Sequence, residues 1–249
     1  MDKVYKKIIT EVRTYFEVNN FQKAVVGISG GIDSALAAKL VADAIGRTRV
    51  FGLIMPEKGI TSERNTSDAI ELCRKLKIRQ WVIEINPFLN QYEKLGWKQS
   101  KIALINTKAR VRATILYNFA NTHNALVAGT SNKSEILLGY GTKYGDLACD
   151  ILVIGDLFKT DVMKLAEHLK LPESILRKAP SAELYVGQTD RDELGAPYRT
   201  LDGILRLIIE GKDYYEILRR YDKRVVRSVF DRIKDTEHKR KQTPAVKAS

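Results

Sequence analysis

The stretch that decides the fold is Ser29-Gly30-Gly31-Ile32-Asp33-Ser34. It lies between the apolar run 24–28 and the helix-forming run 35–44, so the pattern predicts a turn from a buried strand into a helix. Two adjacent glycines let backbone N–H groups approach an anion, and the helix that follows points its positive end at it. We therefore expect this segment, called the glycine loop below, to bind phosphate.

Asp33 is unusual inside such a loop. A carboxylate there repels a phosphate unless a divalent cation lies between them, so the sequence implies magnesium. Neither G-x-x-x-x-G-K-[ST] nor G-x-G-x-x-G is present, which argues against P-loop phosphoryl transfer and a dinucleotide fingerprint. The alternative is that Ser29 and Asp33 only cap the helix and the glycines only form a tight turn.

Composition limits the class of protein. With 249 residues and 44% hydrophobic content, we expect one domain over 1–249, with 236–249 a basic C-terminal tail. The net charge of +12 favours anionic ligands but does not choose among nucleotides, RNA and membranes. Cys73 and Cys149 have no C-x-x-C spacing and fit a reducing cytoplasm. We expect neither a signal peptide nor a membrane span.

Strand and helix patterns alternate along the chain. Buried strands are expected at 24–28, 50–55, 80–85 and 125–128, and helices at 34–45, 62–76 and 99–121. This alternation predicts an α/β protein with a doubly wound, open parallel sheet flanked by helices, Rossmann-like in type. Residues 139–160 are irregular and 188–196 are acidic and expected to be exposed. Helices at 161–169, 201–210 and 214–235 predict a C-terminal helical extension.

The helical pattern 99–121 is apolar on two sides and therefore needs two partners. One is the sheet, and the other is a second subunit or a covering segment of the same chain; we expect a homodimer. Arg110 and Arg112 lie on this helix, and arginine forks bind phosphate and carboxylate oxygens. For Arg112 a solvated basic surface is an equal alternative.

Polar residues follow the strand at 125–128. Thr130 should face the same crevice as the glycine loop, because open α/β sheets bind ligands at the carboxyl ends of their strands. Glu135 comes a few residues later and can reach a metal held near Asp33. The alternative for Glu135 is a helix N-terminal charge or a cap partner of Ser131 or Asn132.

The glycine loop resembles the pyrophosphate-binding loop of the N-type ATP pyrophosphatases. The order of motifs from Ser29 to Lys239 is similar to that of the ammonia-dependent NAD synthetases. The segments that carry this resemblance are 108–110, 129–135, 142–146, 154–160, 178–184, 187–190, 192–195 and 237–239. Gly141 stands where the family usually has a bulky aromatic residue, and Leu147 and Ala148 stand where it usually has a pair of glycines.

The resemblance implies an adenine nucleotide alpha hydrolase-like fold and a ligase that forms a C–N bond. Deamido-NAD would be amidated with ammonia to NAD through an acyl adenylate, with release of AMP and pyrophosphate. It implies magnesium on Asp33 and Glu135, and Lys159 could also neutralise charge on the phosphates during catalysis. The ATP-binding residues would be Gly27, Ile28, Ser29, Gly30, Gly31, Ile32, Asp33, Ser34, Thr130, Lys159 and Ser181. The deamido-NAD-binding residues would be Arg110, Lys143, Asp150, His238 and Lys239.

Two other classes share the loop. A tRNA-modifying ATP pyrophosphatase would use the positive charge to hold RNA, but the sequence has no cysteine pair and no appended RNA-binding module, so we expect no nucleic-acid partner. A non-catalytic nucleotide-binding subunit would not need Asp33, Glu135 and Lys159 together. Only one short helix precedes the first strand, so we expect no attached amidase domain. Arg240 and Lys241 are expected in a solvated tail.

Overall fold

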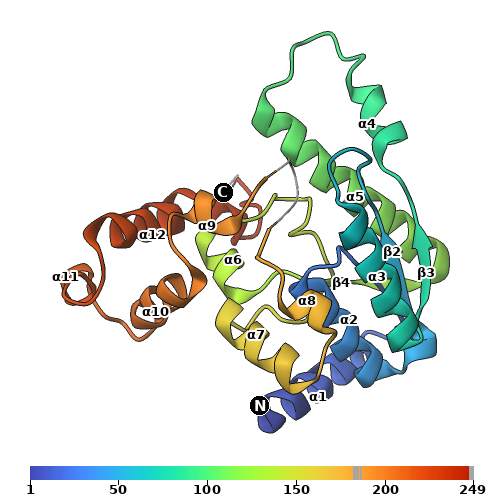
Figure 1. Ribbon diagram of the computed structural model, residues 1–249, viewed down its shortest axis with the longest axis horizontal. Coiled ribbons are helices and arrows are strands. Elements are labelled where there is room, and N and C mark those ends of the chain that lie inside the picture. Colours follow the sequence, from blue (N-terminus) through green and yellow to red (C-terminus); the bar gives the residue numbers. More distant parts are fainter. Residues whose placement is uncertain (182–184, 186, 247–249) are drawn as a thin grey trace.

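A computed structural model describes residues 1–181, 185 and 187–246 and shows a five-stranded sheet covered by helices (Figure 1). The strands are β1 (Lys23–Gly27), β2 (Val50–Ile54), β3 (Arg79–Val82), β4 (Ala125–Gly129) and β5 (Ile151–Leu152). The α-helices are α1 (Asp2–Val18), α2 (Ile32–Ile45), α3 (Glu63–Leu76), α4 (Asn86–Tyr92), α5 (Lys101–His123), α6 (Lys133–Leu138), α7 (Lys159–His168), α8 (Glu173–Leu176), α9 (Asp190–Leu194), α10 (Tyr198–Ile209), α11 (Tyr214–Leu218) and α12 (Lys223–Asp235). Two 3-10 helices are η1 (Arg47–Arg49) and η2 (Glu237–Lys239).

The sheet is parallel throughout, with strand order β3-β2-β1-β4-β5. Val25 of β1 pairs with Phe51 of β2 on one side and with Val127 of β4 on the other. The chain winds outward from β1 in both directions, so the strand order reverses between β1 and β4. The glycine loop and the segment after β4 meet at that reversal, where open α/β sheets bind their ligands. The predicted fold class is confirmed.

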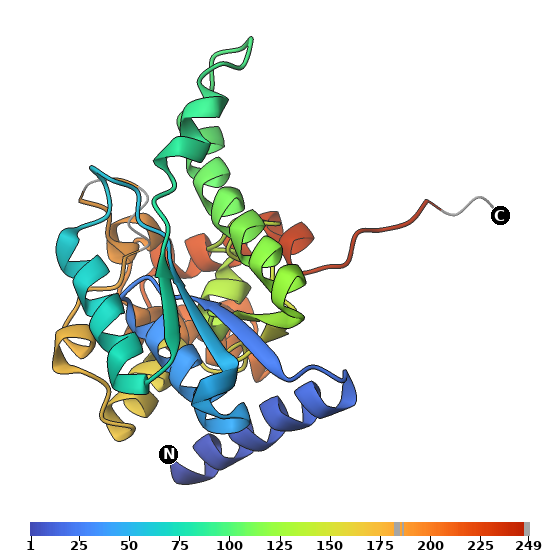
Figure 2. The ribbon, with the colours of Figure 1, turned by 90° about the vertical axis from the view of Figure 1, so that its right-hand side faces the viewer.

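Successive β1 side chains face opposite layers, as a strand requires. Ala24 and Val26 pack in the apolar cluster that includes α1, α2, α3 and α7, whereas Val25 packs in the cluster that includes α5. Figure 2 shows α5 along the sheet, with its first turns and α4 rising beyond it. Within the described part of the chain, no helix has the length and apolar character to cross a bilayer.

Three of the secondary-structure predictions are wrong. Strand β3 ends at Val82, and the unpredicted helix α4 follows with a proline in its first turn. The two-residue strand β5 lies inside the stretch expected to be irregular, since two residues are too short to show periodicity. The helix expected over 214–235 is split into α11 and α12, because the Asp222 carboxylate caps a new helix start.

The acidic segment 188–196 was expected to be exposed, but only Arg191, Asp192 and Gly195 are. Gln188, Asp190 and Leu194 are only 7%, 4% and 2% exposed. Thr189 caps α9 by accepting a hydrogen bond from the backbone N–H of Asp192, and α9 packs inward. The polar side chains tolerate burial because tyrosine hydroxyls and other groups bond to them. Ala182, Glu183 and Leu184 of the preceding motif, and residues 247–249 of the tail, lie outside the described residues.

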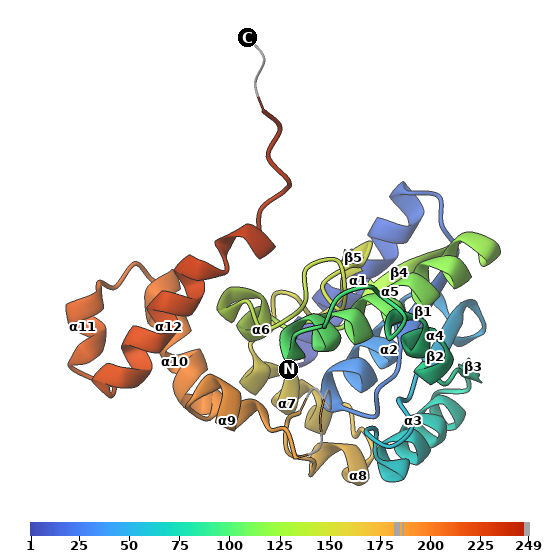
Figure 3. The same cartoon turned by 90° about the horizontal axis from the view of Figure 1, so that it is seen from above.

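Helices α10, α11 and α12 form the expected helical extension to one side of the sheet (Figures 1 and 3). Their apolar side chains pack together and against Leu138 of α6. Arg240 is not in a solvated tail as predicted: its guanidinium donates to the carbonyls of Leu137 and Ile233, at the ends of α6 and α12. Lys241 is exposed as expected and pairs with Glu237 at 2.8 Å. The arginine therefore fastens the extension to α6.

Asp202 of α10 joins this extension to the sheet. It is 2% exposed, and its carboxylate accepts hydrogen bonds from Ser134 Oγ at 2.5 Å and from the Thr160 N–H at 2.8 Å. We expect Asp202→Ala to lower the free energy of unfolding by about 3 kcal/mol, because the buried Ser134 hydroxyl and the half-buried Thr160 N–H lose their acceptor. Unfolding by denaturant measures this change in the free energy of unfolding. The exposed cap variant Asp222→Ala should cost only about 1 kcal/mol, and equal losses would contradict the buried link.

Candidate active site

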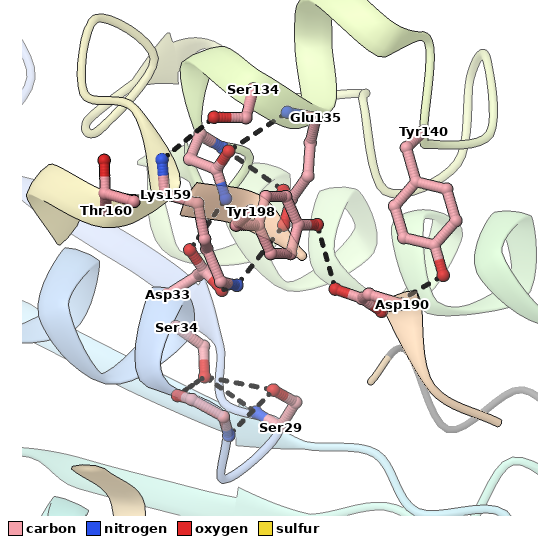
Figure 4. Close-up of polar contacts among 12 residues, drawn as sticks. Ser29, Asp33, Ser34, Ser134, Glu135, Tyr140, Lys159, Thr160, Asp190 and Tyr198 are labelled. Atoms are coloured by element: carbon pink, nitrogen blue, oxygen red, sulfur yellow. Dashed lines mark hydrogen bonds and ion pairs between the residues drawn. The ribbon is translucent and has the colours of Figure 1, made fainter. Parts of the chain in front are cut away.

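The glycine loop leads directly from β1 into α2, which begins at Ile32 with Gly31 as its N-cap. Ser29 Oγ accepts a hydrogen bond from the Gly31 N–H at 3.2 Å, and Ser34 Oγ accepts from the Ser29 N–H at 3.2 Å and donates to the Gly31 carbonyl at 3.0 Å (Figure 4). No side chain caps α2 within the described residues. The capping alternative is therefore wrong, and the positive end of α2 remains available to an anion.

Asp33 and Glu135 converge on one lysine, as Figure 4 shows. Lys159 at the start of α7 donates to Asp33 Oδ2, and its Nζ lies 3.6 Å from Glu135 Oε1. Lys159 is 2% exposed. Burial alone lowers the pKa of Lys159, but the two carboxylates outweigh burial and hold it above its usual range. The lysine is therefore a fixed positive charge beside the glycine loop.

Asn132 aligns both carboxylates. Its side-chain N–H donates to Asp33 Oδ1 at 2.9 Å, and its backbone N–H donates to Glu135 Oε2 at 3.2 Å. The Glu135 N–H in turn bonds to Asn132 Oδ1 at 3.0 Å, which completes a capping box on α6. The capping interpretation of Glu135 is thus confirmed for one of its oxygens, while the other oxygen faces Asp33 and Lys159 and is the one that could bind a metal.

The donor set fits magnesium. Among the residues that the structure describes, no group of three or more His, Cys, Asp and Glu side chains forms a metal cage. Magnesium does not require one, because it keeps several waters and binds through one or two carboxylates together with substrate phosphates. Asp33 Oδ2 and Glu135 Oε1 are hard oxygen donors beside the glycine loop. They would hold the ion once phosphate oxygens complete its shell.

The pH dependence of stability tests the burial of Glu135. Burial and the Asp33 carboxylate raise its pKa to about 8, and Lys159 offsets this only in part. The folded chain then holds a proton that the unfolded chain has lost, so this group's contribution to stability falls as the pH rises from 4.5 to about 8. We expect Glu135→Gln, without metal or nucleotide, to melt several degrees higher than wild type at pH 9, with little difference at pH 5. A difference that does not change with pH contradicts the buried carboxyl.

Sequence reasoning missed the groups that surround Lys159. The Tyr198 ring centroid lies 5.3 Å from Lys159 Nζ, and the Tyr198 hydroxyl donates to Asp190 Oδ2 at 2.9 Å. Tyr140 donates to the other Asp190 oxygen at 3.1 Å. Burial raises the pKa of Asp190. The Thr189 and Asp192 pair signals the start of a helix, but no local pattern signals that this segment folds inward.

A second lysine fastens the glycine loop from outside. Lys178 Nζ bonds to the Gly30 carbonyl at 3.0 Å and to Asn65 Oδ1, and it pairs with Asp68 Oδ2 at 2.5 Å. Gly30 has φ of +81°, and a Cβ there would lie 2.4 Å from the Asn65 carbonyl oxygen. The loop conformation therefore requires glycine at this position.

The other predicted ATP-binding residues lie on two flanking segments. Thr130 follows β4 directly and is half-buried. Ser181 is exposed, and its hydroxyl donates to the Gln188 carbonyl at 2.7 Å. Gly27 ends β1, and Ile28, at 2% exposure, anchors the start of the glycine loop in the core.

Three of the five residues expected to bind the dinucleotide, Arg110, Lys143 and His238, are linked by hydrogen bonds, and Lys239 lies next to His238 in the chain. The Arg110 guanidinium donates to the Lys143 carbonyl at 3.3 Å, and Lys143 Nζ donates to the His238 carbonyl at 2.9 Å. Lys239 Nζ donates to the Gly139 and Gly141 carbonyls at 2.8 and 2.7 Å. The structure thus gathers α5, the segment 139–148 and η2, from distant parts of the sequence, into one basic surface.

Asp150 is held apart from that surface. Its Oδ2 accepts from the Val127 N–H at 2.7 Å and its Oδ1 accepts from the Tyr117 hydroxyl at 3.2 Å, so both oxygens are engaged beside β4. Arg112 is not on a solvated face either, because its Nε donates to the Met55 carbonyl at 3.0 Å at the end of β2. Both side chains are therefore engaged by the sheet, Asp150 beside β4 and Arg112 just after β2.

An anion-binding loop, a carboxylate pair and a buried lysine at the strand-order reversal define a nucleotide-binding protein of the doubly wound α/β class. Residues 4–243 match the family model described as NAD synthase, and the chain belongs to that family. The NH(3)-dependent NAD(+) synthetase of Methanocaldococcus jannaschii is 46% identical, with 98% of this chain and 96% of that protein covered. That of Fusobacterium nucleatum is 39% identical over 97% and 94%.

Solved structures agree with this assignment. The NH3-dependent NAD synthetase of Campylobacter jejuni, in complex with a nitrate ion, is similar with a TM-score of 0.85 and 33% identity over 99% of this chain and 98% of that one. The NMN synthetase of Francisella tularensis is similar with a TM-score of 0.88 and 32% identity over 98% of both chains. The likeness extends across the sheet and the C-terminal helices.

Proposed function

We propose that this chain amidates deamido-NAD with ammonia, at the expense of ATP, to form NAD, AMP and pyrophosphate. The observation that carries the proposal is the convergence of Asp33 and Glu135 on Lys159 beside the open end of α2. Membership of the NAD synthase family and the names of relatives up to 46% identical support the same activity.

The glycine loop and the α2 N-terminus would hold the phosphates of ATP, with Thr130 and Ser181 beside them. Asp33 and Glu135 would hold magnesium, and the bound ion would neutralise charge on the departing pyrophosphate. Lys159 adds a second positive charge at the same place. The nicotinate carboxylate oxygen attacks the α-phosphorus and pyrophosphate leaves, which gives an acyl adenylate. Ammonia then attacks the acyl carbon, loses a proton, and AMP leaves.

The basic surface made by Arg110, Lys143, His238 and Lys239 would receive the dinucleotide. Its charges suit the pyrophosphate of deamido-NAD, because arginine and lysine donors bind phosphate oxygens. In this proposal Asp150 acts only indirectly on dinucleotide binding, because the Val127 N–H and the Tyr117 hydroxyl engage its carboxylate beside β4.

A homodimer and a cytoplasmic location complete the proposal. Large apolar side chains are exposed around α4 and the start of α5, including Trp97 at 67% and Ile102 at 71%. Such a surface is typical of a subunit interface. The thiols of Cys73 and Cys149 are free, which suits a reducing compartment. Sedimentation should give twice the mass of one chain, and Ile102→Glu should give the monomer; a wild-type monomer contradicts the dimer.

The reaction is tested by incubating the protein with ATP, magnesium, ammonium and deamido-NAD, with and without tRNA. We expect NAD and AMP in equal amounts, without dependence on RNA. Nicotinate mononucleotide carries the same carboxylate, and one similar structure is an NMN synthetase. It should therefore be tested as a second substrate in parallel reactions. Preference for the mononucleotide, or pyrophosphate release only with tRNA, would contradict the proposed substrate.

A further inference from the structure

Lys159 occupies a position that a divalent cation would also need. Each carboxylate gives one oxygen to Asn132, with Oδ1 of Asp33 at 2.9 Å from its amide and Oε2 of Glu135 at 3.2 Å from its backbone N–H. The remaining oxygens, Asp33 Oδ2 and Glu135 Oε1, both face Lys159 Nζ. These are the same two oxygens that fit magnesium.

The lysine is held in this position from several sides. Its backbone N–H donates to Ser134 Oγ at 2.9 Å, and Asp202 fixes that serine in turn. Tyr198 covers the side chain, which leaves Lys159 2% exposed. A cation that approaches Asp33 and Glu135 in the nucleotide-free protein therefore meets a like charge that solvent does not screen.

We propose that Lys159 and the divalent cation compete for the Asp33–Glu135 pair, so that nucleotide and cation must bind together. The inference rests on the proposed function, in which triphosphate oxygens lie beside the pair. Those oxygens give Lys159 a new partner and release the carboxylate oxygens for the cation. Because binding linkage is reciprocal, the nucleotide raises the affinity for the cation by the same factor as the cation raises the affinity for the nucleotide.

The test measures Mn²⁺ binding to the nucleotide-free protein, with free Mn²⁺ followed by its paramagnetic resonance signal. Lys159→Met should bind Mn²⁺ at least about tenfold more tightly than wild type, within the range of typical coupling factors. Lys159→Arg keeps the charge and should remain weak. Lys133→Met is the matched control, because Lys133 is also a lysine on a helix's first turn but pairs with the exposed Asp156. It should bind as wild type does.

Equal or weaker Mn²⁺ binding by Lys159→Met overturns the competition, while NAD synthesis by the wild type would leave the proposed function intact. Adding Asp33→Asn to Lys159→Met should remove the gained affinity; if it does not, the cation site itself is misplaced and both proposals fail. If Lys159→Met does not fold, the melting temperature of the wild-type protein tests the competition instead. Magnesium at about 5 mM should then leave its melting temperature unchanged without nucleotide, and a clear rise overturns the inference.

Discussion

Replacing Asp33 by asparagine should lower the rate of NAD formation at least about a thousandfold, because the substitution removes the charge that both Lys159 and the cation require. Asparagine has nearly the same shape and can still accept the hydrogen bond from Asn132. The loss should therefore fall on the chemistry rather than on the fold. Single-turnover measurements with saturating ATP and deamido-NAD record the rate, and circular dichroism records the fold.

Asp43→Asn is the matched control for that experiment. Asp43 lies on the same helix and also pairs with a lysine, Lys39, at 2.5 Å, but it sits at the far end of α2 beside Tyr5. We expect its activity to stay within about twofold of wild type, as for surface positions remote from a site. An Asp33→Asn enzyme that kept a tenth or more of wild-type activity would show that the carboxylate is not part of the reaction.

Gly30→Ala should weaken ATP binding by about a hundredfold, since the alanine Cβ would lie 2.4 Å from the Asn65 carbonyl oxygen in a backbone conformation with φ of +81°. Either the loop moves away from α3 or α3 moves away from the loop. Both outcomes break the alignment of the N–H groups, and the Lys178 bond to the Gly30 carbonyl is lost with it. Equilibrium titration with a fluorescent ATP analogue measures the change.

Gly46→Ala separates backbone strain from loss of the site. Gly46 also has a positive φ, of +94°, but a Cβ there meets no atom within 4 Å, and the residue caps the opposite end of α2. Its cost should appear in stability, at about 1 kcal/mol, and not in nucleotide affinity. If Gly30→Ala binds ATP as well as Gly46→Ala does, the glycine loop is not the phosphate site.

The sheet and its ligand edge were predictable because they depend on local patterns. Buried strands such as 24–28 and 125–128 are continuous apolar runs, and the glycine pair marks the turn between β1 and α2. The meeting of Asp33 with Glu135 followed from placing the fourth strand beside the first. These features depend on the spacing of the motifs along the chain and on the alternation of strands and helices, and a single sequence displays both.

The surroundings of Lys159 were not predictable in the same way. Asp190 and Tyr198 reach the lysine only after α9 and α10 fold back over the sheet, and an acidic run such as 188–196 usually remains exposed. Arg240 was assigned to a solvated tail because its neighbours are basic, yet its guanidinium donates to the carbonyl of Leu137, 103 residues earlier in the chain. In each case the deciding contact joins residues that are distant in sequence, and no local periodicity reports it.

A crystal structure with magnesium and a non-hydrolysable ATP analogue would show directly whether the glycine loop binds the phosphates. We expect the β- and γ-phosphates to lie on the N–H groups of residues 29–34, with the cation between them and the carboxylates of Asp33 and Glu135, and with Lys159 turned to the phosphates. Phosphates bound elsewhere on the protein, with the glycine loop closed by its own side chains, would contradict it.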